Sequence, residues 1–301
     1  MQALVWLLLI DFSCAMDDIL SLYLDQGLHP FQVAFVRFVV NALSVLPWML
    51  PRGLFYFRMA QPMMHFWRAA LGAIAIGCGT IAIMKMPLVQ NTFLTFTESL
   101  FFLPLGAIFL KEHVTKQRVI CSVLGLFGVI FITYQDISLS NFWILLPLMS
   151  AFFFAGTTTI ARKMADDEPL QTLLFYFGLV SGLIFLIPAL LVWKPLCWKQ
   201  LMLLTALGVC GNLIQVFMFR AFQCAEISAF MPLRYMEAIM TFTLGYLIFH
   251  QIPPRTTWLG GSIIVLAALF ITRTERRNDR VGPVSPEVRE EAGHMKRRLG
   301  V

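Results

Sequence analysis

The apolar residues of this chain form ten long runs, separated by short joins that contain proline or charged residues. The runs cover residues 3–23, 31–50, 65–85, 88–110, 117–135, 142–163, 170–193, 200–223, 226–249 and 256–273. An α-helix needs about 20 mostly apolar residues to cross a hydrocarbon core of about 30 Å. No run alternates polar and apolar residues with the period of two that a membrane barrel requires. The pattern therefore predicts ten membrane-spanning helices.

Proline marks many of the joins between the runs. Examples are His29-Pro30, Met86-Pro87 and Pro253-Pro254. The residue before a proline disfavours the helical conformation, so these dipeptides are expected to separate one helix from the next. Because several joins are very short, consecutive helices are expected to pack side by side in antiparallel orientation.

Composition supports a membrane protein. The chain is 58% hydrophobic and 13% charged, and its mean hydropathy is +0.76. Soluble domains have about 25% charged residues. The polar surface that a water-soluble globule needs is therefore missing, and the expected fold class is an all-α integral membrane protein.

Lys and Arg residues are distributed unevenly between the two ends of the predicted helices. With side A defined as the membrane side that holds the N-terminus, 16 of the 23 lie in side-A joins or after residue 272, four lie on side B and three lie within runs. The residues of the side-A joins are Arg52, Arg58, Arg68, Lys111, Lys116, Arg118, Arg162 and Lys163. The positive-inside rule then predicts that both termini are cytoplasmic. Topology thus explains the net charge of +6, which gives no reason to expect a nucleic acid partner.

The chain matches itself at an offset of 139 positions, the separation of Glu98 and Glu237. The same offset pairs further prolines and glycines: Pro30 with Pro169, Gly72 with Gly211 and Gly106 with Gly245. Each half holds five runs, and because five is odd, the second half must enter the membrane from the opposite side. The sequence therefore predicts two inverted five-helix repeats, an arrangement that recurs in transporters working by alternating access.

The predicted domains follow from this duplication. Residues 1–137 form the first five-helix repeat and residues 140–273 the second, inverted one. Residues 274–301 are charged and poor in aromatic residues, and are expected to form a disordered cytoplasmic tail. The six cysteines form no CxxC pair, and no P-loop or HExxH motif occurs. The sequence therefore predicts no metal site, disulfide framework or cofactor, and no enzyme.

Specific segments resemble EamA-type carriers of the drug/metabolite transporter superfamily. Residues 96–115, which end in FLKEHVT, and residues 235–253 resemble the paired fourth and ninth helices of that family. Residues 12–17 (FSCAMD) and 35–38 (FVRF) are similar to the first two helices of a branch that includes S-adenosylmethionine carriers. Two positions depart from the pattern, since Ala238 replaces a common proline and Gln251 a common glutamate. The departures concern a helix bend and a helix-end contact.

Ionisable residues in the middle of apolar runs are candidates for a substrate or proton site, because burying a charge in a membrane is costly. Glu98 shares a helical face with Asn91 and Thr95. Glu237 follows Arg234 by three positions, close enough for an ion pair. Glu98 and Glu237 are the predicted coupling residues. The alternative is structural: Glu98 hydrogen-bonded to another helix, and Glu237 neutralised by Arg234 throughout.

Other polar residues of the runs complete the predicted substrate site. Asp17 and Arg37 carry the family resemblance, which implies that Arg37 contributes to a central cavity and holds a ligand carboxylate; snorkelling to the interface is its alternative. The remaining candidates are Asn41, Asn212, Gln215, Tyr176 and Tyr235. Either tyrosine can instead serve packing or the interfacial aromatic belt.

The favoured function is a secondary transporter that moves a small polar metabolite, zwitterionic or cationic, such as an amino acid or S-adenosylmethionine. Acidic and basic candidates together suit such a ligand, and proton symport and exchange for a counter-substrate both remain open. One alternative is an exporter of amino acids or drugs, and another is a non-transporting membrane receptor or enzyme. The resemblance implies a bacterial inner membrane, with the lipid bilayer and the substrate as partners and a homodimer as a candidate assembly.

Overall fold

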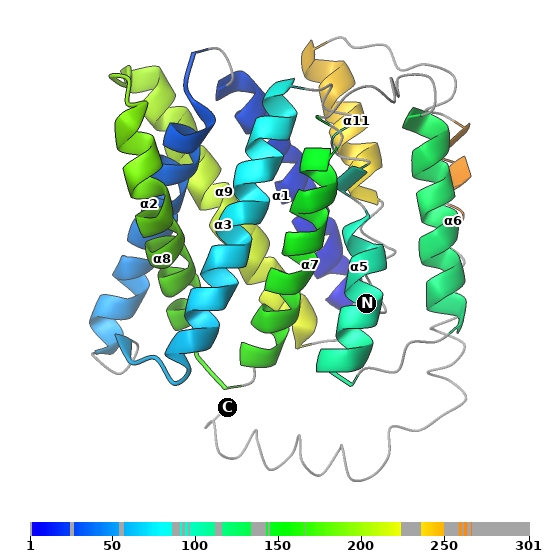
Figure 1. Cartoon of the computed structure of the whole chain (residues 1–301), viewed down its shortest axis with the longest axis horizontal. Coiled ribbons are helices and arrows are strands. Elements are labelled where there is room, and N and C mark those ends of the chain that lie inside the picture. The colour runs from blue at the N-terminus through cyan, green and yellow to red at the C-terminus, as the bar shows by residue number, and fades with distance from the viewer. Residues whose placement is uncertain are drawn as a thin grey trace.

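The computed structural model describes residues 2–24, 27–53, 57–85, 97–111, 116–133, 145–165, 167–223 and 236–249, together with 91, 94, 95, 143, 259, 260, 262, 263 and 266. The elements in these residues are helical, which agrees with the all-α fold class. They are α1 (Gln2–Leu24), α2 (Pro30–Met49), the short 3-10 helix η1 (Leu50–Arg52), α3 (Pro62–Lys85), α5 (Glu98–Phe109), α6 (Lys116–Thr133), α7 (Leu145–Met164), α8 (Leu170–Leu191), α9 (Trp198–Phe222) and α11 (Met236–Phe249). Figure 1 shows them as one bundle of roughly upright helices.

Seven of the ten predicted runs coincide with a helix whose ends differ from the prediction by at most three residues: α1, α2, α3, α6, α7, α8 and α9. Five of the described helices, α2, α3, α7, α8 and the stretch Trp198–Ala221 of α9, are long and apolar enough to cross a membrane. The fourth and ninth runs are described in part, as α5 and α11. Most of the tenth run and the tail 274–301 lie outside the described residues, so the ten-helix count stays a prediction.

Local sequence explains where two of the helices begin. Pro30 occupies the first turn of α2, where a missing backbone N–H costs nothing. His29 caps this helix, and its Nδ1 accepts a hydrogen bond from the backbone N–H of Phe31 at 3.3 Å. Pro169 likewise directly precedes α8. The prolines that punctuate the sequence therefore begin helices.

The outer surface of the bundle is apolar. On α8, the exposed side chains Leu183, Ile187 and Leu191 recur every four residues, with exposed fractions of 59%, 69% and 81%. The opposite face of the same helix carries the buried Phe177, Ser181 and Phe185. A soluble monomer rarely exposes such a continuous apolar surface, but a bilayer requires it.

Helices α2 and α8, which the offset of 139 makes equivalent, lie side by side and run in opposite directions. Gln32 near the start of α2 bonds with Lys194 after the end of α8, with its Nε2 2.7 Å from the Lys194 carbonyl oxygen. In the middle, the equivalent residues Phe38 and Phe177 contact each other, with ring centroids 5.7 Å apart. The opposite directions of these two helices agree with the inverted repeat that the sequence predicts.

Packing between the other helices follows the same exchange. Helix α1 packs against α9 and α11, whereas its equivalent α7 packs against α3 and α5, which are the equivalents of α9 and α11. Small residues allow the closest approaches: a Cβ added to Gly178 of α8 would lie 2.7 Å from the backbone nitrogen of Ala42 in α2. The described helices of the first predicted repeat and those of the second are therefore arranged around a common centre.

Candidate functional site

A cavity of about 170 Å³ lies between the helices of the first predicted repeat and those of the second. Its walls come from α1, α2, α3, α5, α7, α8, α9 and α11, and from Asn91 and Thr95 before α5. Five charged residues line it: Asp17, Asp18, Arg37, Glu98 and Glu237. Among the described residues, the lining thus holds four carboxyl groups and one guanidinium.

Asp17 of α1 and Arg37 of α2 form an ion pair on the cavity wall. Arg37 Nη2 lies 2.9 Å from Asp17 Oδ1, and the two side chains are only 11% and 13% exposed. Gly211 of α9 leaves space for this pair, since a Cβ at that position would lie 3.3 Å from Arg37 Nη2. The guanidinium thus lies against the cavity, whereas a snorkelling side chain would reach the interface.

The predicted stripe of Asn91, Thr95 and Glu98 also lies on the cavity wall. Thr95 Oγ1 donates a hydrogen bond to the backbone carbonyl oxygen of Asn91 at 3.0 Å. Glu98 is buried, and its Oε1 accepts from Thr158 Oγ1 of α7 at 3.3 Å. Glu237 of α11, equivalent to Glu98 under the offset, is buried at the same cavity.

The other predicted site residues divide between the cavity wall and its support. Asn41 and Gln215 line the cavity. Asn212 lies behind the wall, where its Nδ2 donates to the Asn41 carbonyl oxygen at 2.8 Å. Tyr176 is absent from the lining, and its hydroxyl donates to the Phe57 carbonyl oxygen at 2.6 Å. Arg234 and Tyr235 lie outside the described residues.

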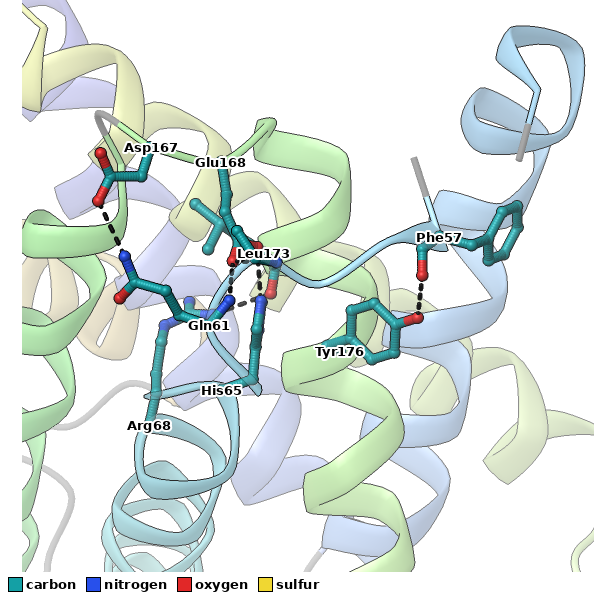
Figure 2. A network of polar contacts seen from close by, with 9 residues as sticks. Phe57, Gln61, His65, Arg68, Asp167, Glu168, Leu173 and Tyr176 are labelled. Carbon is teal, nitrogen blue, oxygen red and sulfur yellow. Dashed lines mark hydrogen bonds and ion pairs between the residues drawn. The ribbon is translucent and has the colours of Figure 1, made fainter. Parts of the chain in front are cut away.

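A second polar cluster, which sequence reasoning missed, joins the segment before α3 to the connection between α7 and α8 (Figure 2). We call it the side-A cluster; it consists of Ala60, Gln61, His65, Asp167 and Glu168. Glu168 Oε1 accepts from the backbone nitrogens of Ala60 and Gln61, each at 3.0 Å. Its Oε2 lies 2.6 Å from His65 Nε2. At the surface, Gln61 Nε2 donates to Asp167 Oδ2 at 3.0 Å. The cluster therefore ties the two predicted repeats together at side A.

Replacing Glu168 by Ala should destabilise the protein strongly, whereas Asp167→Asn should have little effect. The first change leaves two backbone N–H groups and His65 without their buried acceptor, at a cost of about 3–5 kcal/mol. The second acts at an exposed contact and keeps an acceptor oxygen, so it should cost less than about 1 kcal/mol. Thermal unfolding of the purified protein in detergent measures both. Equal shifts in the two variants would contradict the structural role assigned to Glu168.

The position of Arg68 corrects a prediction. The sequence placed it among the side-A joins, but its side chain is fully buried in α3, with 0% exposure. Arg68 Nη1 donates to the Leu173 carbonyl oxygen at 2.8 Å, and Nη2 donates to Gln215 Oε1 at 3.1 Å. Its count as a surface charge was wrong, because carbonyl and amide oxygens from α8 and α9 replace its hydration. Its location within the run 65–85 was the signal that could have revealed it.

A bundle of helices with an apolar outer surface around a cavity lined by charged residues is typical of a membrane protein. The comparisons with known proteins specify the class: the chain belongs to the EamA-like transporter family, whose model matches residues 1–134 and again 141–273. It is therefore an integral membrane protein and a transporter of that family. This agrees with the resemblance found in the sequence.

Several proteins named as transporters are similar to most of the chain. The S-adenosylmethionine uptake transporter of Rickettsia felis is 31% identical over 272 residues, covering 90% of this chain and 92% of that protein. The riboflavin transporter of Vibrio cholerae is 27% identical, covering 93% and 96%. The pseudopaline exporter of Pseudomonas aeruginosa is 27% identical, covering 81% and 87%. One solved crystal structure superposes with a TM-score of 0.71 at 17% identity, covering 90% and 98%, and supports the fold alone.

Proposed function

We propose that this chain is a secondary transporter for a zwitterionic or cationic metabolite, with S-adenosylmethionine as the leading substrate. The observation that carries the proposal is the charge of the cavity wall. Among the described residues, Asp17, Asp18, Glu98 and Glu237 line it together with one guanidinium, that of Arg37. In a low-dielectric site, this excess of acidic groups favours a cationic ligand over an anionic one.

S-adenosylmethionine matches this lining group by group. Its sulfonium and ammonium charges suit the carboxylates, and its carboxylate suits the planar fork of Arg37. The similarity to S-adenosylmethionine uptake transporters in Rickettsia felis and Rickettsia prowazekii supports the same choice. Riboflavin has no cationic group for the acidic wall to bind, so the cavity favours the sulfonium ligand.

Alternating access is the mechanism that we assign to the bundle. The cavity volume of about 170 Å³ is below the range of about 300–1,000 Å³ typical of ligand pockets, so a nucleoside-sized ligand needs the helices to separate. The side-A cluster holds the two repeats together on the side predicted to face the cytoplasm. Opening there, exchanged for opening at side B, would deliver the ligand across a bacterial inner membrane.

Export is the second candidate function. The similarity to the pseudopaline exporter supports it, and a symmetric carrier runs in whichever direction its coupled gradients drive. Export of an amino acid or a drug would use the same cavity. Uptake remains the proposal, because several of the similar proteins are named uptake transporters.

The native cysteines provide a test of the proposed ligand and its location. Cys14 of α1 lines the cavity, whereas Cys197, before α9, is exposed. S-adenosylmethionine should slow the alkylation of Cys14, followed by peptide mass spectrometry, and leave the rate at Cys197 unchanged. S-adenosylhomocysteine should protect less at equal concentration, because it lacks the sulfonium charge.

An unchanged Cys14 rate at saturating S-adenosylmethionine would contradict binding in this cavity. Equal protection by both ligands would contradict the role given to the acidic wall. Equal protection of Cys14 and Cys197 would indicate a general stabilisation of the protein and would also count against the proposal.

A further inference from the structure

Arg68 is a buried cation that forms no direct ion pair with a described carboxylate, although Glu168 is close enough to act on its charge. Among the described residues, no carboxyl oxygen lies within 4.0 Å of its guanidinium nitrogens. Its charge is instead solvated by the carbonyl oxygen of Leu173, by the amide oxygen of Gln215 and by two aromatic faces. The guanidinium carbon lies 4.5 Å from the ring centroid of Phe177 and 5.6 Å from that of Phe219. Figure 2 shows Arg68 between α3 and α8, next to Leu173.

This arrangement fixes the orientation of the Gln215 amide. Arginine can only donate hydrogen bonds, so the atom that faces Arg68 must be the amide oxygen, which lies 3.1 Å from Nη2. Gln215 is half-buried and lines the cavity. Because its oxygen accepts from Arg68, Gln215 has its NH₂ group, a donor, to offer to a ligand in the cavity.

Two aromatic rings line the same cavity. Phe177 of α8 and Phe154 of α7 belong to the lining and pack in one cluster. The Arg68 guanidinium packs against the ring of Phe177. Gly72 leaves space for this ring, since a Cβ at Gly72 would lie 2.4 Å from Phe177 Cε2. Arg68 thus positions both a hydrogen-bond donor and an aromatic wall, although it does not line the cavity itself.

We propose that Gln215, Phe154 and Phe177 form a subsite for a planar heteroaromatic ring that carries hydrogen-bond acceptors, and that Arg68 is its positioning residue. Aromatic side chains stack on the faces of such rings, and the NH₂ group of Gln215 donates to a ring nitrogen. The inference deepens the proposed function, because it assigns the purine of an adenosyl ligand to this subsite. The zwitterionic part of the ligand is left to Asp17 and Arg37.

Fragment binding to the purified protein tests the subsite. Purine riboside carries only acceptors on its ring, and L-methionine has no ring. Gln215→Glu keeps an oxygen for Arg68 but removes the donor, and Gln215→Leu removes it without adding a charge. Both variants should weaken the dissociation constant of purine riboside about tenfold, the effect of one lost hydrogen bond, while that of L-methionine stays within about twofold.

Arg68 variants test the positioning role. Arg68→Met frees the Gln215 amide to turn, so it should reproduce the selective loss of purine riboside binding. Arg68→Lys should restore part of the affinity, because lysine is also a pure donor but lacks the planar fork. A structural defect would instead weaken both fragments together. If an Arg68 variant fails to fold, the Gln215 variants still decide the question.

Failure of the subsite and failure of the proposed function give different results. Purine riboside that does not bind the wild type, or binds the Gln215 variants unchanged, would overturn the subsite. S-adenosylmethionine transport would then still support the proposed function. Purine riboside that binds with the expected selectivity would support the subsite even if no transport were detected.

Discussion

Asp17→Asn should lower transport of S-adenosylmethionine by about 10- to 100-fold, because a hydrogen bond to a charged group contributes about 1.5–3 kcal/mol to binding. The variant leaves the Arg37 guanidinium uncompensated on the cavity wall, where Asp17 lies 2.9 Å from it in the wild type. It also removes one of the four carboxyl groups that the described residues contribute to the cavity lining. Initial rates of counterflow in proteoliposomes, normalised to the amount of folded protein, measure the effect.

The double variant Asp17→Asn/Arg37→Gln separates a structural pair from a ligand-binding pair. It leaves no unpaired charge, so thermal stability should return towards that of the wild type. Transport should stay low, because both ligand-binding charges are gone. A double variant that regains both stability and transport would show that the pair only holds α1 against α2, and the binding role of Asp17 would be wrong.

Glu98→Gln should abolish uptake driven by a pH gradient while counterflow exchange persists. Glutamine can still accept the hydrogen bond from Thr158, which is 3.3 Å long in the wild type, but it cannot release a proton at the centre of the membrane. Driven uptake should fall at least about tenfold, with counterflow within about twofold, as expected when only a coupling group is lost. Both rates can be measured in the same proteoliposomes with and without an imposed gradient.

Glu237→Gln is the matched comparison for this experiment. Glu237 is the equivalent of Glu98 in the second predicted repeat and lines the same cavity. The two variants together show whether one glutamate or both couple to protons. If the rate of uptake by the wild type does not depend on the pH gradient, exchange for a counter-substrate is favoured. Driven uptake that survives in both variants would remove the two glutamates as coupling residues.

Hydrophobic runs and prolines were sufficient to predict most of the described helices. A segment that crosses a bilayer must satisfy its backbone hydrogen bonds internally, and an α-helix does so. Ionisable residues such as Asp17 and Glu98 stood out within those runs because their burial is costly. The structure places both on the cavity wall. Sequence could therefore indicate which side chains need a polar cavity without showing where that cavity lies.

Residues whose roles depend on distant partners were not predictable. Arg68 looked like an interfacial charge near the start of a run, but its partners Leu173 and Gln215 lie 105 and 147 positions away in the sequence. Glu168 looked like part of a polar join, and its burial follows from backbone groups that the segment before α3 supplies. Tyr176 is in a similar position, since its partner Phe57 also lies outside its own helix. Only the tertiary packing distinguishes these three residues from polar residues at the surface.

Counterflow of labelled S-adenosylmethionine by the wild-type protein in sealed proteoliposomes tests the carrier assignment most directly. Unlabelled S-adenosylmethionine inside the vesicles should accelerate entry of the labelled compound. The carrier can then return to the outward-facing state with a bound ligand, and this exchange is expected to be faster than the return of the empty carrier. The same load of S-adenosylhomocysteine should accelerate entry less. Entry of the labelled compound at the rate of protein-free vesicles, with folded protein present and either load inside, would contradict the account.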